Sequence, residues 1–272
     1  MNESIKQNLI QHGIKPDRSA GQNFLLDMDI IKKITQTAKL KADDTVLEIG
    51  AGPGNLTKEL STRVKRVIAI ESDQKIFTLL KKNMASCSNV EIYNKDIIRW
   101  WEQQKRHFLN KPYKIVANLP YNITGLVLRT FVSRNPKPLS MTVLVQEEVA
   151  DRLVAKKGKM SKLSVMVQHY GTVEKIFRVS RSSFWPAPNV DSAVVEISKI
   201  KKTHADDVEL FRLIRVGFSS KRKQLHNNLK VGYKKEKKDV EKAIKDAKLS
   251  EKVRAQDLSP DDWKELCKIL QK

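Results

Sequence analysis

The chain has 272 residues, which is enough for one large domain with an appendage or for two modest domains. Its 40% hydrophobic content can supply a packed core, and no run approaches the roughly 20 apolar residues that span a membrane. The net charge of +21 favours a polyanionic partner, nucleic acid ahead of a membrane surface. The two cysteines lie far apart and indicate a reducing compartment without structural zinc, so we expect a cytoplasmic protein.

Short apolar runs alternate with helical patterns between residues 45 and 147, which predicts an α/β fold with a parallel sheet. Before them, residues 1–20 look mostly helical, and Asp27 or Asp29 can cap the next helix. Strands are predicted at 45–49, 67–71, 90–93, 114–118 and 141–147, and helices at 55–63, 73–83, 97–107 and 123–134.

The pattern changes toward the C-terminus. Residues 147–171 look helical, and two strands at 173–179 and 192–200 suit an antiparallel pair. The segment 184–188 between them is predicted to be a loop. From about residue 203 the pattern is all helical, so we predict an α/β domain at 1–202 and a small helical domain at 203–272, whose last helix opens at Ser259-Pro260.

The stretch Glu48-Ile-Gly-Ala-Gly-Pro-Gly54 joins a buried strand to a helix. Its glycines let the backbone turn tightly and approach a ligand, and the helix N-terminus points N–H groups at the same place. A dinucleotide-binding loop needs its third glycine at position 55, which is Asn. The spacing therefore favours S-adenosylmethionine (SAM), which has an amino-acid tail and a sulfonium but no pyrophosphate.

Polar side chains follow the next predicted strands. Glu71 lies about 20 residues after Gly50, where an acid receives ribose hydroxyls. Asp96 follows the third strand and can accept a hydrogen bond from an adenine amino group, and Asn118 ends the fourth strand. Because open α/β sheets bind ligands at the carboxyl ends of their strands, we expect these side chains to share one site.

The tetrapeptide Asn118-Leu-Pro-Tyr121 is the most specific feature, although alone it could be an ordinary strand-ending turn. An exocyclic amine on adenine is a poor nucleophile, because its lone pair is delocalised into the ring. Asn118 Oδ1 and the carbonyl of Leu119 can hold its two N–H groups, and Pro120 stiffens the turn. Tyr121 offers a ring for base stacking, so catalysis would be mostly positioning and electrostatics.

Together these motifs resemble the ribosomal RNA adenine N6,N6-dimethyltransferases, which act on small-subunit RNA. The resemblance covers nearly the whole chain. It also includes Gly21-Gln-Asn-Phe-Leu25, Phe184-x-Pro-x-Pro188 leading to Val190-Asp-Ser-Ala-Val-Val195, and Phe218-Ser-Ser-Lys-Arg-Lys-Gln-Leu-His-Asn-Asn-Leu229. It implies a seven-stranded, Rossmann-like SAM-dependent methyltransferase domain with a small helical C-terminal domain. The implied product is two adjacent dimethyladenosines in the 3′-terminal hairpin of small-subunit (16S) RNA.

The resemblance also implies roles for single residues and a partner. Asn23 and Leu25 would cover the SAM cofactor, whose site is completed by Gly50, Gly52, Glu71, Asp96 and Asn118. Phe184 would sandwich the target base with Tyr121, with Trp185 as the alternative. Lys221, Arg222 and Lys223 form a basic cluster that contacts RNA phosphate or is only a solvated face. The expected partner is small-subunit RNA or the immature small ribosomal subunit, bound by a monomer without membrane contact.

The remaining polar residues carry weaker signals. Asp191 and Ser192 favour a turn leading into a strand. The five histidines show no metal spacing, so no metal site is expected. Two alternative functions remain: a large-subunit RNA methyltransferase of the erythromycin-resistance type, which more often carries Asn-Ile-Pro-[Tyr/Phe], or an RNA-binding ribosome assembly factor with secondary enzymatic activity.

Overall fold

The computed structural model describes residues 2–17, 21–108, 111–204 and 207–271, which form two compact units. The first unit contains residues 1–150 and 172–200, and the second contains residues 151–171 and 201–272. The sequence placed 151–171 in the first domain, but Met160 and Val165 pack into the core of the C-terminal helices. The described helices are all too short or too polar for a bilayer crossing.

A seven-stranded mixed sheet forms the centre of the first unit, in the order β4-β3-β2-β5-β6-β9-β7, so the predicted fold class is confirmed. Its strands are β2 (Thr45–Ile49), β3 (Arg66–Glu71), β4 (Val90–Asn94), β5 (Lys114–Asn118), β6 (Met141–Gln146), β7 (Thr172–Val179) and β9 (Ser192–Ser198). The first five are parallel, while β9 runs antiparallel to both β6 and β7, which confirms the predicted antiparallel pair.

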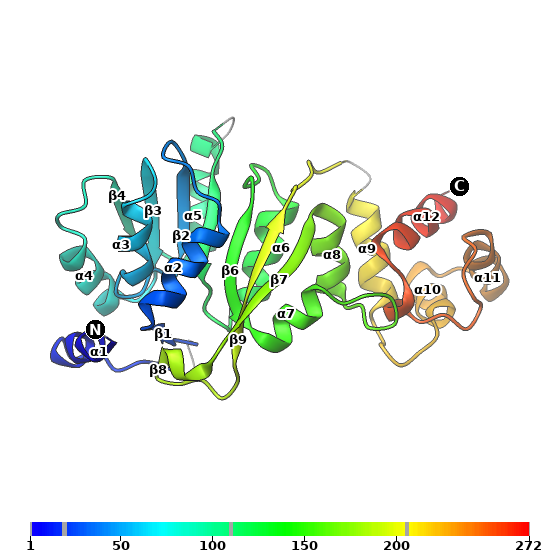
Figure 1. Ribbon diagram of the computed structural model, residues 1–272. Helices are drawn as coiled ribbons and strands as arrows, with labels where there is room; N and C mark the ends of the chain where they lie inside the picture. The colour runs from blue at the N-terminus through cyan, green and yellow to red at the C-terminus, as the bar shows by residue number, and fades with distance from the viewer. Residues whose placement is uncertain (1, 18–20, 109–110, 205–206, 272) are drawn as a thin grey trace. The chain divides into compact units, whose positions relative to one another are not determined.

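Helices cover both faces of this sheet, as buried parallel strands require. The helices of this part of the chain are α1 (Asn2–Gln11), α2 (Met28–Thr37), α3 (Asn55–Ser61), α4 (Gln74–Asn83), α5 (Ile97–Gln104), α6 (Thr124–Ser133) and α7 (Glu147–Leu153). In Figure 1, α2 and α3 lie in front of the strands, whereas α5 and α6 lie behind them. Trp101 of α5 packs against Phe131 of α6, with ring centroids 4.8 Å apart. Asp27, not Asp29, caps α2.

One prediction about local structure was wrong, and another needs a boundary. The segment 184–188 is not wholly a loop, because β8 (Phe184–Trp185) pairs antiparallel with β1 (Phe24–Leu25). The two strands lie far apart in sequence, so neither showed a strand pattern by itself. Residues 147–171, predicted to be helical, form two helices: α7 ends at Leu153, and α8 (Lys162–Tyr170) begins after Ser161, whose side chain caps it.

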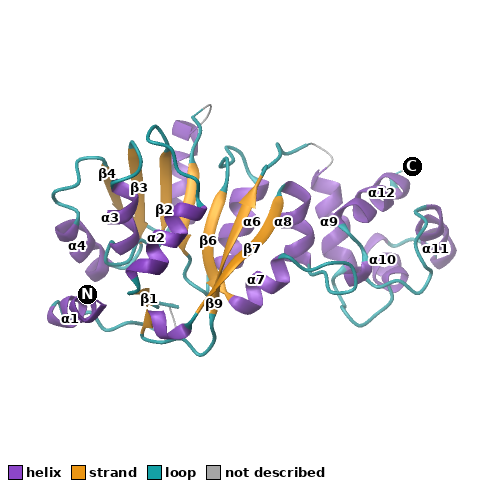
Figure 2. Ribbon diagram, viewed as in Figure 1, coloured by secondary structure: helices purple, strands orange, loops and turns teal. Residues whose placement is uncertain are grey.

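The second unit consists of helices and loops in its described part (Figure 2). After α8 come α9 (Asp207–Gly217), α10 (Leu225–Tyr233), α11 (Lys237–Asp246) and α12 (Pro260–Leu270). Trp263 is fully buried at the centre of their core. Ser259 caps α12 with Pro260 at its first position, as predicted from the sequence.

Candidate active site

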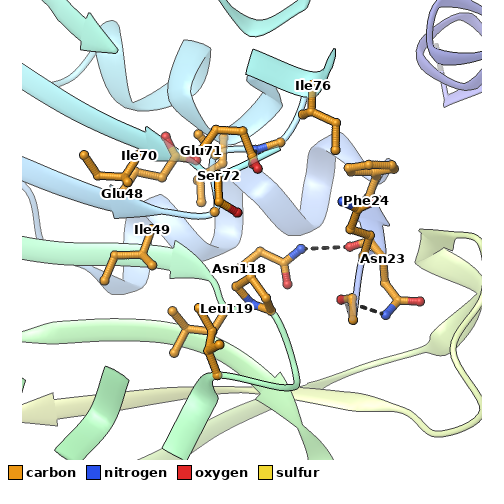
Figure 3. A pocket seen from close by; sticks show the side chains of 18 of the residues that line it. Asn23, Phe24, Glu48, Ile49, Ile70, Glu71, Ser72, Ile76, Asn118 and Leu119 are labelled. Atoms are coloured by element: carbon orange, nitrogen blue, oxygen red, sulfur yellow. Dashed lines mark hydrogen bonds between the residues drawn. The ribbon is translucent and has the colours of Figure 1, made fainter. Parts of the chain in front are cut away.

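A cavity of about 260 Å³ lies at the carboxyl ends of the parallel strands. The strand order reverses between β2 and β5, and open α/β sheets bind ligands beside such a switch point. The cavity is lined by the segment 21–25, by the glycine loop after β2, and by the residues that end or follow β3, β4 and β5 (Figure 3). The predicted cofactor residues Asn23, Leu25, Gly50, Gly52, Glu71, Asp96 and Asn118 all line it, as do Leu119, Pro120 and Tyr121.

The glycine loop packs directly against the Asn118-Leu-Pro-Tyr121 turn. Gly50 has a φ of +72°, and a Cβ there would lie 2.9 Å from Cδ of Pro120. Any larger residue would therefore be strained and would push the two ligand-binding turns apart. This contact explains why the sequence places glycine and proline at these two strand ends.

Glu71 ties the glycine loop to the end of β3. Its Oε2 accepts a hydrogen bond from the backbone N–H of Gly52 at 2.9 Å, and its Oε1 accepts one from Asp73 N–H at 2.9 Å. Burial raises the pKa of Glu71, although both hydrogen bonds oppose this shift. Each carboxylate oxygen can accept a further hydrogen bond, so the side chain can support the loop and still receive ligand hydroxyls.

Glu48 is the most deeply buried acid of the cavity, with 1% of its surface exposed. Its Oε2 accepts no hydrogen bond from any residue that the structure describes. Burial, with a smaller contribution from the negative charge of Glu71, raises the pKa of Glu48 to about 8. The sequence marked Glu48 only as the residue that opens the motif.

The charge of the cavity wall suits a cationic ligand better than a polyanion. The acids Glu71 and Asp96 line it against one lysine, Lys95, among the described lining residues. Glu48, with a pKa of about 8, is mostly protonated and neutral near pH 7. Asp96 also caps α5, because its Oδ1 accepts from the N–H groups of Ile98 and Arg99. Its Oδ2 accepts no hydrogen bond from the described residues and can meet a donor on a ligand.

Asn118 is held in one orientation by the N-terminal segment. Its Nδ2 donates to the backbone carbonyl of Asn23 at 3.1 Å, as the dashed line in Figure 3 marks. This bond fixes the amide so that Oδ1 is the acceptor that remains, and no described residue donates to it. The carbonyl of Leu119 likewise accepts no hydrogen bond within the described ranges. Two neighbouring acceptors can therefore receive the two hydrogens of one amino group.

Tyr121 and Phe184 differ in their surroundings. Tyr121 lines the cavity, and its hydroxyl lies 2.7 Å from Oγ of Ser192. Burial raises the pKa of Tyr121, so the ring stays a neutral phenol. Phe184 is only 4% exposed, pairs with Leu25 across β1 and β8, and packs into the core beneath α2. Its stacking role stays a prediction, and it would require the ring or the β8 segment to move.

The N-terminal segment closes one side of the cavity. A Cβ on Gly21 would lie 3.0 Å from the backbone nitrogen of Tyr121, so the segment runs directly over the Asn118-Leu-Pro-Tyr121 turn. The carbonyl of Leu25 accepts a hydrogen bond from Nδ2 of Asn55, the residue that replaces the third glycine of a dinucleotide loop. The sequence indicated only that Asn55 occupies the position of a glycine in dinucleotide-binding loops, and it did not predict the hydrogen bond to Leu25. Phe24, which also lines the cavity, gave no signal in the sequence.

The predicted RNA-binding cluster lies in the second unit. Lys221, Arg222 and Lys223 are exposed in the turn between α9 and α10. Buried Asn228 holds this turn, because its Nδ2 donates to the carbonyls of Gly217 and Ser220. The contact of these basic residues with RNA stays a prediction. In the described ranges, no group of three or more His, Cys, Asp and Glu side chains is arranged to hold a metal ion.

Comparison with known proteins assigns a family. Residues 14–272 match the model of a family described as ribosomal RNA adenine dimethylase. The chain is 38% identical, over 265 residues, to ribosomal RNA small subunit methyltransferase A of Dehalococcoides mccartyi. That match covers 96% of this chain and 91% of the relative.

Two solved structures share the fold over most of the chain. A dimethyladenosine transferase from Plasmodium falciparum superposes with a TM-score of 0.70 at 29% identity, covering 88% of this chain and 94% of that one. The 23S rRNA methyltransferase ErmE superposes with a TM-score of 0.69 at 27% identity, covering 92% of this chain and 100% of that one. The fold is thus common to a protein titled dimethyladenosine transferase and to one titled 23S rRNA methyltransferase.

Proposed function

The chain belongs to the ribosomal RNA adenine dimethylase family, and on that premise we propose that it transfers methyl groups from SAM to adenine N6 in small-subunit ribosomal RNA. The products would be two adjacent N6,N6-dimethyladenosines in the 3′-terminal hairpin of the 16S RNA. The substrate particle would be the immature small subunit, met in the cytoplasm by a monomer of this protein.

One observation carries this proposal: the acceptors suited to an amine share a cavity with the groups suited to SAM. Asn118 Oδ1 and the Leu119 carbonyl lie on the same cavity as Glu71 and the glycine loop. The acids Glu71 and Asp96 of the wall fit a ligand with a sulfonium and an ammonium group, and Glu71 has lone pairs left for ribose hydroxyls.

The side chains of this cavity have separate tasks in the proposed reaction. When bound, SAM supplies an activated methyl group, so no strong general base is needed to start the transfer. Asn118 Oδ1 and the Leu119 carbonyl hold the two N–H groups of the target amine and favour its pyramidal form. Tyr121 presents a neutral ring on which the flipped adenine stacks, and Pro120 keeps the turn rigid. The proposed contribution of the protein to catalysis is thus to position the target amine against the methyl group of SAM.

The large-subunit alternative is disfavoured by sequence rather than by fold. The two solved relatives fit almost equally well, so fold similarity does not separate their substrates. The 38% identical relative is named for the small subunit, and the tetrapeptide here is Asn118-Leu-Pro-Tyr121. A role mainly as an assembly factor, with methylation secondary, is disfavoured because the acceptors and acids of the cavity are all present.

Mass mapping of RNA tests the proposal. The protein and SAM are incubated with immature small subunits and, separately, with protein-free large-subunit RNA. We expect a gain of two methyl groups on each of two adjacent adenosines in the small-subunit 3′ hairpin only. Methylation confined to large-subunit RNA would favour the erythromycin-resistance type. Tight binding to small subunits with only a small fraction of them methylated would favour the assembly factor with secondary enzymatic activity.

A further inference from the structure

A second cavity, of about 210 Å³, lies entirely within the second unit and is separate from the proposed active site. Its walls come from the end of α8, the loop 201–204, the first turns of α9 and the exposed side of α12. Nothing in the methyl-transfer chemistry described above uses these residues.

Four lysines stand around this cavity. Lys201 and Lys202 come from the loop, while Lys264 and Lys268 are four residues apart and share one face of α12. Acidic neighbours hold the helical pair only weakly, because Lys264 Nζ lies 3.5 Å from Asp261 and Lys268 Nζ lies 3.9 Å from Glu265, all at the surface. The rim is therefore a concentration of positive charge that an anion can approach.

Among the residues that the structure describes, one acid lines this cavity, Asp207, and it offsets only part of the charge of the four lysines. Asp207 is 5% exposed, and its Oδ1 lies 2.9 Å from Nε2 of His169. Its Oδ2 accepts from the Tyr170 hydroxyl at 2.9 Å and from His204 N–H at 2.8 Å. Burial opposes ionisation, but these hydrogen bonds outweigh it and lower the pKa of Asp207. The carboxylate is thus occupied inside the wall and braces the loop against α8.

The wall of the cavity below the lysine rim combines the rings of His169 and Tyr170 with apolar side chains. Of these apolar side chains, Leu210 and Cys267 are 4% and 7% exposed. The lysine side chains carry long methylene stems that cover apolar surface while their ammonium groups reach water. A ligand that fits this combination has a flat apolar part and an anionic part next to it, which describes a nucleotide.

We infer that this cavity binds one nucleotide of the substrate RNA, with its phosphate at the lysine rim and its base against Leu210 and Cys267. The assignment rests on the proposed function, which makes RNA the polyanion that the +21 chain meets. A free nucleotide offers the same chemistry, so the experiment must separate the two sources.

Charge reversal on α12 tests the RNA contact. Lys264→Glu/Lys268→Glu is compared with Lys242→Glu/Lys245→Glu on α11, where both lysines are exposed and lie three residues apart. We expect the α12 double variant to weaken binding of small-subunit RNA at least about tenfold. The slope of log K against log salt concentration should shrink by the equivalent of about two phosphate contacts, and both effects should exceed those of the α11 control. SAM affinity and the single-turnover rate at saturating RNA should not change. Equal losses from the two pairs would overturn the site.

Methyl NMR spectra of the full chain test the base. Adenosine monophosphate should shift the Leu210 methyl signals more than ribose 5-phosphate does at the same concentration. Equal shifts from the two compounds would show that the base does not bind in the cavity. If adenosine monophosphate binds but the α12 pair loses no more RNA affinity than its control, the site takes free nucleotides and the RNA assignment is wrong. These binding results stand even if the wild-type protein methylates no adenosine, so the two proposals fail separately.

Discussion

The hydroxyl of Tyr121 lies 2.7 Å from Oγ of Ser192, which is completely buried at the first position of β9. The bond joins the proposed base-stacking ring to the antiparallel part of the sheet. Ser192 belongs to the segment Val190-Asp-Ser-Ala-Val-Val195, which the sequence alone assigned to turn and strand formation. Its side chain therefore positions a proposed site residue as well as ending a turn.

Ser192→Ala should release the Tyr121 ring without touching the cofactor site. We expect an unfolding free energy lower by about 1 kcal/mol, because a buried hydroxyl loses its partner. The single-turnover rate should fall about tenfold through poorer placement of the base, while SAM affinity stays constant. Tyr121→Phe removes the same bond from the other side. In a double-mutant cycle the combined variant should lose little more than either single variant, and fully additive losses would mean that the two side chains act independently.

Asn118→Ala should lower the methyl-transfer rate far more than RNA affinity. The amide is oriented by its bond to the Asn23 carbonyl, and loss of one positioned acceptor costs on the order of a hundredfold in rate. RNA affinity comes mainly from phosphate contacts. Tyr121→Ala should differ by weakening capture of the flipped base as well. Single-turnover rates and filter-binding affinities measure both effects, and a near-normal rate for Asn118→Ala would move the chemistry elsewhere in the cavity.

Glu71→Ala should weaken SAM binding by about 1.5–3 kcal/mol, since it removes a charge-assisted acceptor. The structure adds a second expected effect, because the N–H groups of Gly52 and Asp73 lose their acceptor and the glycine loop loosens. Glu71→Gln keeps one carbonyl acceptor, so its SAM affinity should fall between those of Glu71→Ala and the unchanged protein. Calorimetric titration with SAM and thermal unfolding without it separate ligand binding from loop support. Unchanged SAM affinity in Glu71→Ala would remove Glu71 from the cofactor site.

Glu48 should make the ligand-free protein less stable as pH rises. Its pKa is about 8 in the folded chain and 4.5 ordinarily, so between these values the folded state keeps a proton that the unfolded state has released. The free energy of unfolding therefore falls across this window, by on the order of 5 kcal/mol at most. Glu48→Gln stays neutral and should show a flatter profile. Urea unfolding of both proteins at pH 6 and pH 9 measures the difference, and parallel profiles would show that Glu48 ionises normally.

The sequence predicted the sheet and its ligand edge because both depend on local patterns. Apolar runs such as Val67–Ile70 are typical of strands buried on both faces, and a polar residue directly after such a run lies at the carboxyl edge. For this reason Glu71, Asp96 and Asn118 could be assigned to one cavity from their positions in the chain. The family resemblance rested on motifs that are short and contiguous in the chain, and the match of residues 14–272 to the family model confirmed it.

Only the tertiary structure decided the contacts between segments far apart in the chain. Neither Phe24–Leu25 nor Phe184–Trp185 looks like a strand, because a two-residue strand exists only through its partner. The same holds for the Asn118–Asn23 bond and the Tyr121–Ser192 bond, which join residues separated by 95 and 71 positions. The sequence by itself thus determined which residue types reach the cavity. Packing between distant segments decided the orientation of the side chains in the cavity. A hydrogen-bond partner that lies far away in the chain leaves no periodic pattern in the sequence around the residue that it orients.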